Sequence, residues 1–225
     1  MTDTVSDQIR EIHQKMITAA DHAGRNPDAI TLVAVSKKQP DDRIDSALKA
    51  GQRIYGENRV QEAKERWGDR RRLYPDLELR LIGPLQTNKA GDAVALFDVI
   101  ESVDREKLAR ILAEECRKQD RRIECLIQVN TGEEDQKAGI APGEAVGFSH
   151  YCRDDLGLNV TGLMCIPPID EEAAMHFTLL NTLAREAGLD KLSMGMSADY
   201  EQAIGFGATH VRVGSALFGD RPQLA

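Results

Sequence analysis

A pair of lysines at the end of an apolar segment is the feature of this sequence best suited to covalent chemistry. The segment 31–40 (TLVAVSKKQP) is apolar and β-branched up to Lys37 and then reaches a proline. Because side chains alternate along a strand, Val33, Val35 and Lys37 share one face, which suits the inside of a parallel barrel. A lysine that caps such an interior is partly desolvated, which favours the neutral amine and makes it a candidate Schiff-base nucleophile. The alternative is that Lys37 and Lys38 are both solvated loop charges.

Small and hydroxyl-bearing residues follow two later apolar segments, where an anion could be bound. The run 193–197 (SMGMS) follows one of them, and Gly214 and Ser215 follow the other. Barrels often bind phosphate with the loops after their last two strands and the start of a short helix, because backbone N–H groups point at the anion there. The Ser197 and Ser215 hydroxyls can donate as well. Ser197 could instead be the N-cap of a short helix that begins near Asp199.

An amine at Lys37 and a phosphate site across the mouth of a barrel would suit a ligand that carries an amine-reactive group at one end and a phosphate at the other. Pyridoxal 5′-phosphate has that shape, with an aldehyde for a lysine and a phosphate for a helix terminus. Sugar phosphates and indole phosphates, bound by an ordinary barrel enzyme, are the alternatives that the residues leave open.

The elements that must position these groups alternate regularly along the chain. We expect strands near residues 30–36, 53–55, 79–82, 97–101, 123–129, 160–166, 192–194 and 209–213, each followed by a helix. Such alternation implies parallel strands, and eight units in about 200 residues favour a closed barrel. The predicted fold is α/β: a single (β/α)8 TIM barrel domain over residues 1–225, with an extra N-terminal helix. The alternative is an open doubly wound sheet, but no Gly-x-Gly-x-x-Gly follows the first strand.

Other polar residues fall where predicted strands end, which is the edge where barrels carry their chemistry. Asn58 follows the second strand, Gly83 the third, Asn130 and Lys137 the fifth, and Arg212 lies in the eighth. Asn58 could be a turn residue or a helix N-cap, and Gly83 could simply permit a turn. Arg212 could pair with an acid on an outer helix, and Lys137 could be solvated.

Composition and charge exclude several classes of function. With 225 residues, 41% of them apolar and 29% charged, the chain has the make-up of an ordinary globular protein. A formal charge of −8 argues against general affinity for nucleic acid or anionic membranes. The first residues do not form a signal peptide, and no apolar run approaches the ~18 residues of a membrane span. The four cysteines contain no CxxC and the five histidines no HxxxH or HxH, so we expect reduced thiols, no metal site and a cytoplasmic protein.

Seven segments, taken together, resemble the pyridoxal phosphate homeostasis protein family. They are AVSKKQP (34–40), YGENRVQEA (55–63), IGPLQTNKA (82–90), LIQVNTGEEDQKAGI (126–140), GLMCIPP (162–168), LSMGMSADYEQAI (192–204) and VRVGSALFG (211–219). That family has the fold of the alanine racemase N-terminal barrel, the fold-type III class. The resemblance covers nearly the whole chain in one order.

The resemblance implies a role for each of six residues. Lys37 corresponds to the Schiff-base lysine, Ser197, Gly214 and Ser215 to phosphate ligands, Asn58 to a residue near the cofactor, and Arg212 to the arginine that faces the pyridine nitrogen. Because arginine only donates, a ring nitrogen beside it must accept and stay unprotonated, which makes the ring a poorer electron sink. One departure is Arg80, which stands where the family usually has a histidine between aromatic residues.

The function implied is that of a binding protein. Racemases of this class need a second, β-rich domain that supplies a catalytic tyrosine, whereas this sequence ends at Ala225 soon after the last predicted strand. We therefore expect no catalytic residues and a monomer that holds pyridoxal 5′-phosphate reversibly, supplies it to apoenzymes and serves vitamin B6 homeostasis. The alternatives are an amino-acid racemase or lyase with the same cofactor, and a phosphate-binding barrel enzyme without it.

Overall fold

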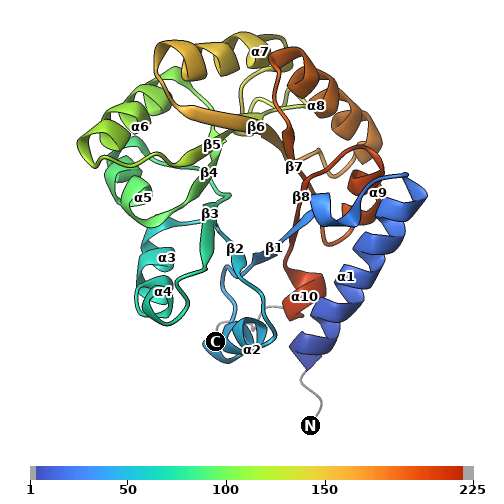
Figure 1. Ribbon diagram of the computed structural model, residues 1–225. Coiled ribbons are helices and arrows are strands. Elements are labelled where there is room, and N and C mark those ends of the chain that lie inside the picture. Colours follow the sequence, from blue (N-terminus) through green and yellow to red (C-terminus); the bar gives the residue numbers. More distant parts are fainter. Residues whose placement is uncertain (1–3, 220–225) are drawn as a thin grey trace.

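Eight parallel strands close into a barrel in the computed structural model, which describes residues 4–219 (Figure 1). Each strand pairs with the next along the chain, and the last pairs with the first. The strands are β1 Thr31–Val35, β2 Ile54–Glu57, β3 Glu78–Leu81, β4 Val99–Val103, β5 Glu124–Val129, β6 Asn159–Cys165, β7 Lys191–Met196 and β8 His210–Val213. The predicted (β/α)8 barrel is confirmed.

Helices surround the barrel, and one of them precedes the first strand, as predicted. The α-helices are α1 Thr4–His22, α2 Asp41–Lys49, α3 Val60–Trp67, α4 Arg70–Leu73, α5 Ala90–Leu96, α6 Glu106–Lys118, α7 Pro142–His150, α8 Ala173–Ala187, α9 Tyr200–Gly205 and α10 Ser215–Phe218. Short 3-10 turns lie at Pro27–Ala29 (η1) and Thr87–Lys89 (η2), and a π-helical turn (η3, Tyr151–Asp155) continues α7. Helix α1 packs against α9 and α10, and its buried stripe consists of Val5, Ile9, Ile12, Met16 and Ala20.

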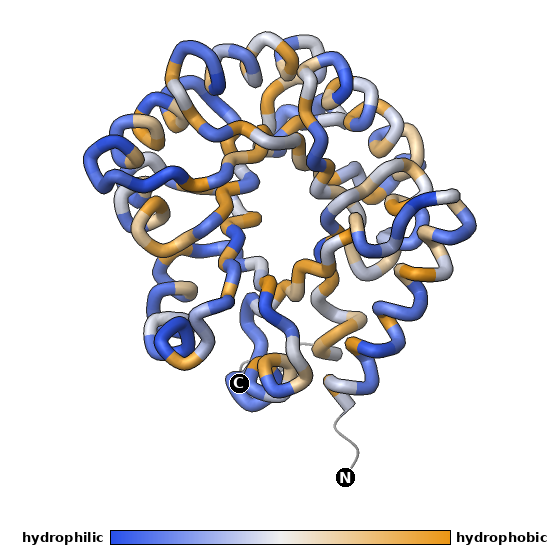
Figure 2. Tube along the Cα trace, in the orientation of Figure 1, coloured by the Kyte–Doolittle hydropathy of each residue, from blue (hydrophilic) through white to orange (hydrophobic). Residues whose placement is uncertain are grey.

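The two faces of each strand have different surroundings, and this decides which side chains reach the barrel interior. On β1, Leu32 and Ala34 belong to the apolar core between strands and helices. Val33 points the other way, since a Cβ added to Gly56 would lie 3.1 Å from its side chain. Figure 2 shows apolar residues along the strands and hydrophilic residues over the outer surfaces of the helices. The alternation predicted for the first strand is therefore correct.

Some element boundaries differ from the prediction. The fourth strand begins at Val99 rather than at residue 97; just before it, the Asp98 carboxylate accepts the N–H of Leu79 on β3. The seventh strand is six residues long instead of three, and helix α4 was not predicted. Among residues 4–219, no helix has the length and apolar character needed to span a bilayer.

Candidate cofactor site

One cavity of about 290 Å³ lies at the carboxyl end of the barrel, and all six residues singled out in the sequence line it. They are Lys37, Asn58, Ser197, Arg212, Gly214 and Ser215. The remaining described lining is mostly apolar: Val35, Ile82, Ile166, Met196 and Ala198. The ends of β1, β2, β7 and β8 thus bring together residues that are far apart in the sequence.

The Lys37 amine lies beside Ser197, Gly214 and Ser215, which together we call the anion loop, and this corrects one expectation. We expected Lys37 across the mouth of the barrel from the loops after the last strands. Closure instead pairs β1 with β8, with Val33 opposite Arg212. A Cβ added to Gly214 would lie 3.4 Å from the Cβ of Val35. The cavity therefore spans the β1–β8 seam, and residues from the ends of both strands line it.

The two lysines after β1 have different surroundings. Lys37 is half-buried and lines the cavity, so the alternation of the strand continues to this residue. Lys38 is exposed, and its φ of 56° places it in the left-handed region, where the chain turns away from the strand. The solvated-loop interpretation is correct for Lys38 only.

A buried carboxylate ties the turn that carries both lysines to helix α3. Glu57, at the end of β2, is fully buried, and its Oε1 accepts from Ser36 Oγ at 2.7 Å, Trp67 Nε1 at 3.0 Å and Arg66 at 3.1 Å. Arg66 also donates to the carbonyl oxygens of Ser36 and Gln39, at 2.8 and 3.0 Å. Sequence reasoning missed this clamp, whose one visible signal is an acidic residue at the end of a short apolar strand.

The anion loop presents donors that meet at one point. Ser197 Oγ accepts from the backbone N–H groups of Gly214, at 3.2 Å, and Ala216, at 3.4 Å. The N-cap interpretation of Ser197 is wrong, because Asp199 holds that position and its carboxylate accepts the N–H of Met196. Two amides at the start of α10 therefore converge on Ser197 Oγ, whose hydroxyl lines the cavity together with that of Ser215.

Asn58 has a polar atom that no described residue satisfies. Its Oδ1 is buried without a hydrogen-bond partner in residues 4–219. Asn58 is not the N-cap of α3, which is Arg59. Gly83 does more than permit a turn, because an added Cβ would lie 2.3 Å from the carbonyl oxygen of Asn58. The close approach of these two backbones fixes Asn58 at the wall of the cavity.

Arg212 lies inside the barrel, so its predicted alternative partner on an outer helix is wrong. The side chain is buried and donates to Ser193 Oγ at 2.8 Å and to the carbonyl oxygen of Cys165 at 2.7 Å. A guanidinium has five N–H groups, so donors remain for the cavity that Arg212 lines. Lys137 does not line the cavity; it pairs with Glu134 at 2.5 Å and donates to the carbonyl oxygen of Pro167.

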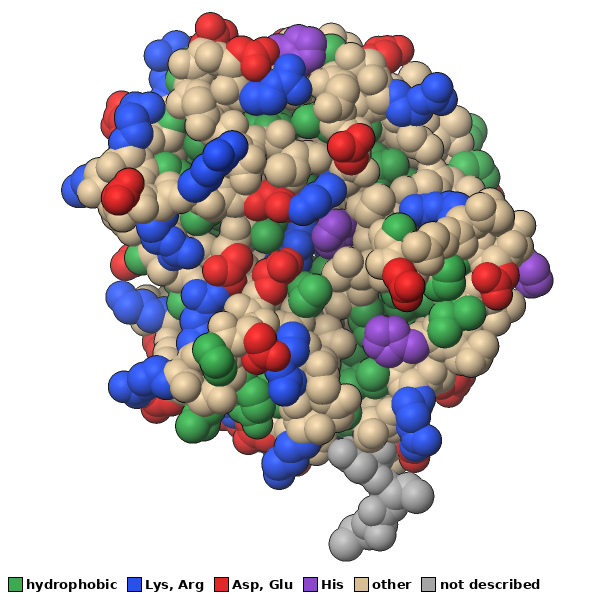
Figure 3. Space-filling view, viewed as in Figure 1, with side chains coloured by type: hydrophobic (Ala, Val, Ile, Leu, Met, Phe, Trp, Pro, Cys, Tyr) green, Lys and Arg blue, Asp and Glu red, His purple; other side chains and the backbone are tan. Residues whose placement is uncertain are grey.

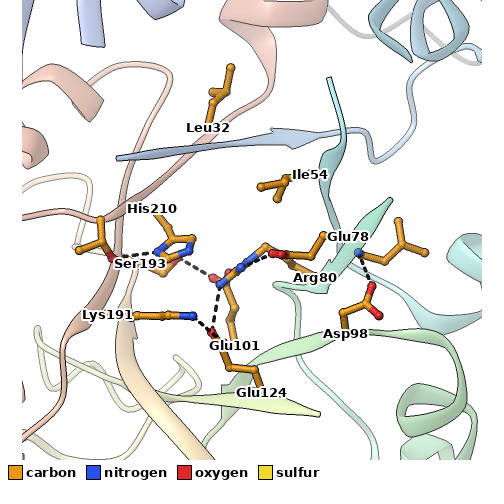
Figure 4. Close-up of polar contacts among 12 residues, drawn as sticks. Leu32, Ile54, Glu78, Arg80, Asp98, Glu101, Glu124, Lys191, Ser193 and His210 are labelled. Atoms are coloured by element: carbon orange, nitrogen blue, oxygen red, sulfur yellow. Dashed lines mark hydrogen bonds and ion pairs between the residues drawn. The ribbon is translucent and has the colours of Figure 1, made fainter. Parts of the chain in front are cut away.

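Charged side chains fill the opposite end of the barrel, where β3, β5, β7 and β8 begin. Figure 3 shows acidic, basic and histidine side chains gathered over the middle of the barrel, and Figure 4 shows them in detail. Lys191 pairs with Glu124 at 2.5 Å, and Arg80 lies between Glu78 and Glu124. Desolvation, and after it the nearby Arg80 charge, lower the pKa of His210 to about 3. The histidine there is neutral at ordinary pH.

Comparisons with known proteins find relatives that match nearly the whole chain. The profile of the family described as alanine racemase, N-terminal domain, matches residues 12–222. The Pyridoxal phosphate homeostasis protein of Pseudomonas aeruginosa is 40% identical over 97% of this chain and 96% of its own. That of Escherichia coli K12 is 35% identical over 96% of this chain and 97% of its own.

The fold and the family profile place the chain in the class of alanine racemase N-terminal barrels. Within that class, it belongs to the pyridoxal phosphate homeostasis protein family. PipY from Synechococcus elongatus PCC7942 superposes with a TM-score of 0.83 without PLP and 0.80 with PLP bound, at 35% and 34% identity. Both comparisons cover 96% of this chain and all of PipY. Alanine racemase from Clostridium difficile shares the fold alone, at 15% identity and a TM-score of 0.71 over 94% of this chain and 57% of its own.

Proposed function

We propose that this protein holds pyridoxal 5′-phosphate reversibly on Lys37 and acts in vitamin B6 homeostasis as a carrier that supplies the cofactor to apoenzymes. The observation that carries the proposal is the single cavity in which an amine, a converging set of anion donors and a buried arginine meet. The name of the relatives and the PLP-bound state of PipY support the same ligand.

The residues present fit this ligand. Pyridoxal 5′-phosphate supplies an aldehyde that condenses reversibly with a primary amine, a phosphate dianion and a ring nitrogen. Lys37 offers the amine; the amides of Gly214 and Ala216 with the Ser197 and Ser215 hydroxyls offer the phosphate site. The buried acceptor Asn58 Oδ1 is available to a donor on the ligand. Arg212 would offer a donor to the ring nitrogen, which would then have to accept and stay unprotonated.

The titratable residues around Lys37 support the proposal that the protein is a carrier rather than an enzyme. Among the described residues that line the cavity, Lys37 and Arg212 are the titratable ones. A second acid–base group, which two-base racemisation requires, is not found in this part of the lining. A ring nitrogen held unprotonated by Arg212 also withdraws electrons poorly.

The attachment of the ligand is tested by reduction with borohydride and peptide mapping. We expect the label on Lys37 and its loss in Lys37→Ala, whereas Lys38→Ala, a neighbouring control that removes the same charge, keeps it. A label found mainly on Lys38 would contradict the assignment.

The carrier role is tested with the loaded protein and a pyridoxal-phosphate-dependent apoenzyme. We expect the apoenzyme to regain activity, and we expect no exchange of the α-proton of alanine or serine in heavy water beyond that given by free cofactor. Exchange on the order of 1 s⁻¹, within the range of ordinary enzymes, would favour a racemase instead.

A further inference from the structure

Two oppositely charged side chains are buried inside the barrel, outside the cavity lining. Arg80 and Glu101 are 1% and 0% exposed, and Arg80 Nε donates to Glu101 Oε1 at 2.5 Å (Figure 4). Arg80 also pairs with Glu78. Neither Arg80 nor Glu101 lines the cavity, so the pair acts on a ligand there only through another residue.

Ser193 links this pair to Arg212. The second carboxylate oxygen of Glu101, Oε2, accepts from Ser193 Oγ at 2.5 Å. Ser193 Oγ in turn accepts from Arg212 at 2.8 Å, and the other terminal nitrogen of Arg212 donates to the Cys165 carbonyl oxygen. A continuous chain of hydrogen bonds therefore runs from Arg80 through Glu101 and Ser193 to the arginine at the cavity.

The carboxylate of Glu101 stays ionised in this position. Burial alone would raise the pKa of Glu101, but Arg80 and Arg212, with the hydrogen bond from Ser193, together lower it below its ordinary value. Its charge compensates two buried guanidinium groups. Because a guanidinium is planar and directional, fixing two of its nitrogens fixes where the remaining N–H groups point.

We propose that Glu101, through Ser193 and with Arg80 behind it, is a positioning residue that orients Arg212 toward the ring nitrogen of pyridoxal 5′-phosphate. This inference rests on the proposed function, since it gives Arg212 a role toward that ligand. It also explains Arg80, which stands where the resemblance led us to expect a histidine. Arg80 holds the first oxygen of Glu101, so that the second is left for Ser193.

The test compares two ligands: pyridoxal 5′-phosphate and an analogue in which carbon replaces the ring nitrogen. In the unaltered protein we expect the natural ligand to bind at least about tenfold more tightly, the ratio that a hydrogen bond from a charged donor gives. In Glu101→Gln and in Ser193→Ala, this ratio should fall to within about threefold of unity while the affinity for the analogue changes little. The matched control is Ser102→Ala, because Ser102 is the next residue on β4, is fully buried, and its hydroxyl has no partner in residues 4–219.

Each outcome separates the orienting role from a structural one. Variants that keep the tenfold ratio, or that lose both ligands equally, overturn the proposal while the carrier function stands. Failure of the unaltered protein to bind either ligand at Lys37 overturns the proposed function itself. If the unaltered protein binds both ligands equally, Arg212 has no role toward the ring nitrogen, and the proposal is overturned. If Glu101→Gln does not fold, Ser193→Ala gives the same readout, because it removes one hydroxyl and no charge.

Discussion

Lys37 and Lys38 have the same chemistry, yet the structure gives them different surroundings. The alternation of side chains along β1 continues to Lys37 and directs its side chain into the cavity. The left-handed φ of Lys38 turns the chain, and the Lys38 side chain is exposed to solvent. Small side chains matter next to them. Because Gly214 and Ser197 are small, the Gly214 N–H can approach and donate to the Ser197 hydroxyl oxygen. At this scale, position on the strand decides chemical role.

The first prediction concerns the phosphate group. Ser215→Ala should weaken the binding of pyridoxal 5′-phosphate by about 1.5–3 kcal/mol, because it removes one hydroxyl donor to a charged group and leaves the backbone donors in place. Binding of pyridoxal, which lacks the phosphate, should not change. Titrations of both vitamers measure the difference; an equal loss for both would contradict a phosphate site at Ser215.

At the scale of elements, the turn between β1 and α2 is stabilised by side chains from neighbouring elements. Arg66 and Glu57 reach it from α3 and β2, and both partners are largely removed from solvent. Removal of one partner from a buried ion pair leaves the other charge uncompensated, which costs more than the pair itself contributes.

The second prediction concerns the loss of one partner from this buried ion pair. Arg66→Met should lower the free energy of unfolding by about 3 kcal/mol, because it strands the Glu57 carboxylate in the interior. Arg70→Met is the matched control, since Arg70 is equally covered but pairs with the more exposed Asp45; its loss should be within about 1 kcal/mol. Urea unfolding measures both, and equal losses would argue against the buried clamp.

The third prediction concerns the contact between the ends of β2 and β3. Gly83→Ala should destabilise the protein by about 3 kcal/mol, because a Cβ there meets the backbone of Asn58 and neither chain can move aside easily. Gly143→Ala, in helix α7 with nothing near the added atom, should instead stabilise it by about 0.5–1 kcal/mol. Thermal unfolding of the pair distinguishes a steric cause from a general effect of replacing glycine.

Local patterns predicted the eight strands and the extra helix, because the alternation of side chains and the turn residues depend on neighbouring positions. They also marked nine residues at strand ends, and the resemblance to the family selected the six that line the cavity. The interior charges were harder to predict. Arg80 lies between two leucines and Glu101 between Ile100 and Ser102, and each resembles an exposed residue until its partner is known. Most of their partners come from other strands, Glu101 on β4 for Arg80 and Ser193 on β7 for Glu101, so they are defined only by the assembled sheet.

At the scale of the whole molecule, the charges inside the barrel make stability depend on pH. His210 hydrogen-bonds Thr209 and lies near Arg80, Glu101, Lys191 and Arg212. Its lowered pKa means that the unfolded chain binds a proton near pH 6.5, while the native protein does so only near pH 3. The contribution is complete above pH 6.5 and is lost progressively as the pH falls toward 3.

The fourth prediction is therefore a pH-dependent difference between the unaltered protein and His210→Gln. Between about pH 7.5 and 5.5 the unaltered protein should lose about 1.4 kcal/mol more of its unfolding free energy, the cost of one pKa unit. Urea unfolding at the two pH values measures both proteins, and the common effect of carboxylates cancels. Parallel pH profiles would mean that His210 has the same pKa in the folded and the unfolded protein.

The seam between β1 and β8 has a consequence for how the protein matures. Lys37 leaves the ribosome well before the strand that carries Arg212 and the loop with Gly214 and Ser215. A nascent chain that has not yet produced β8 can form neighbouring strand–helix units, but it has neither the buried arginine nor the anion loop. If these residues hold the cofactor, a chain that stops before β8 should not retain it, because the proposed site forms only when β8 joins β1 and closes the ring.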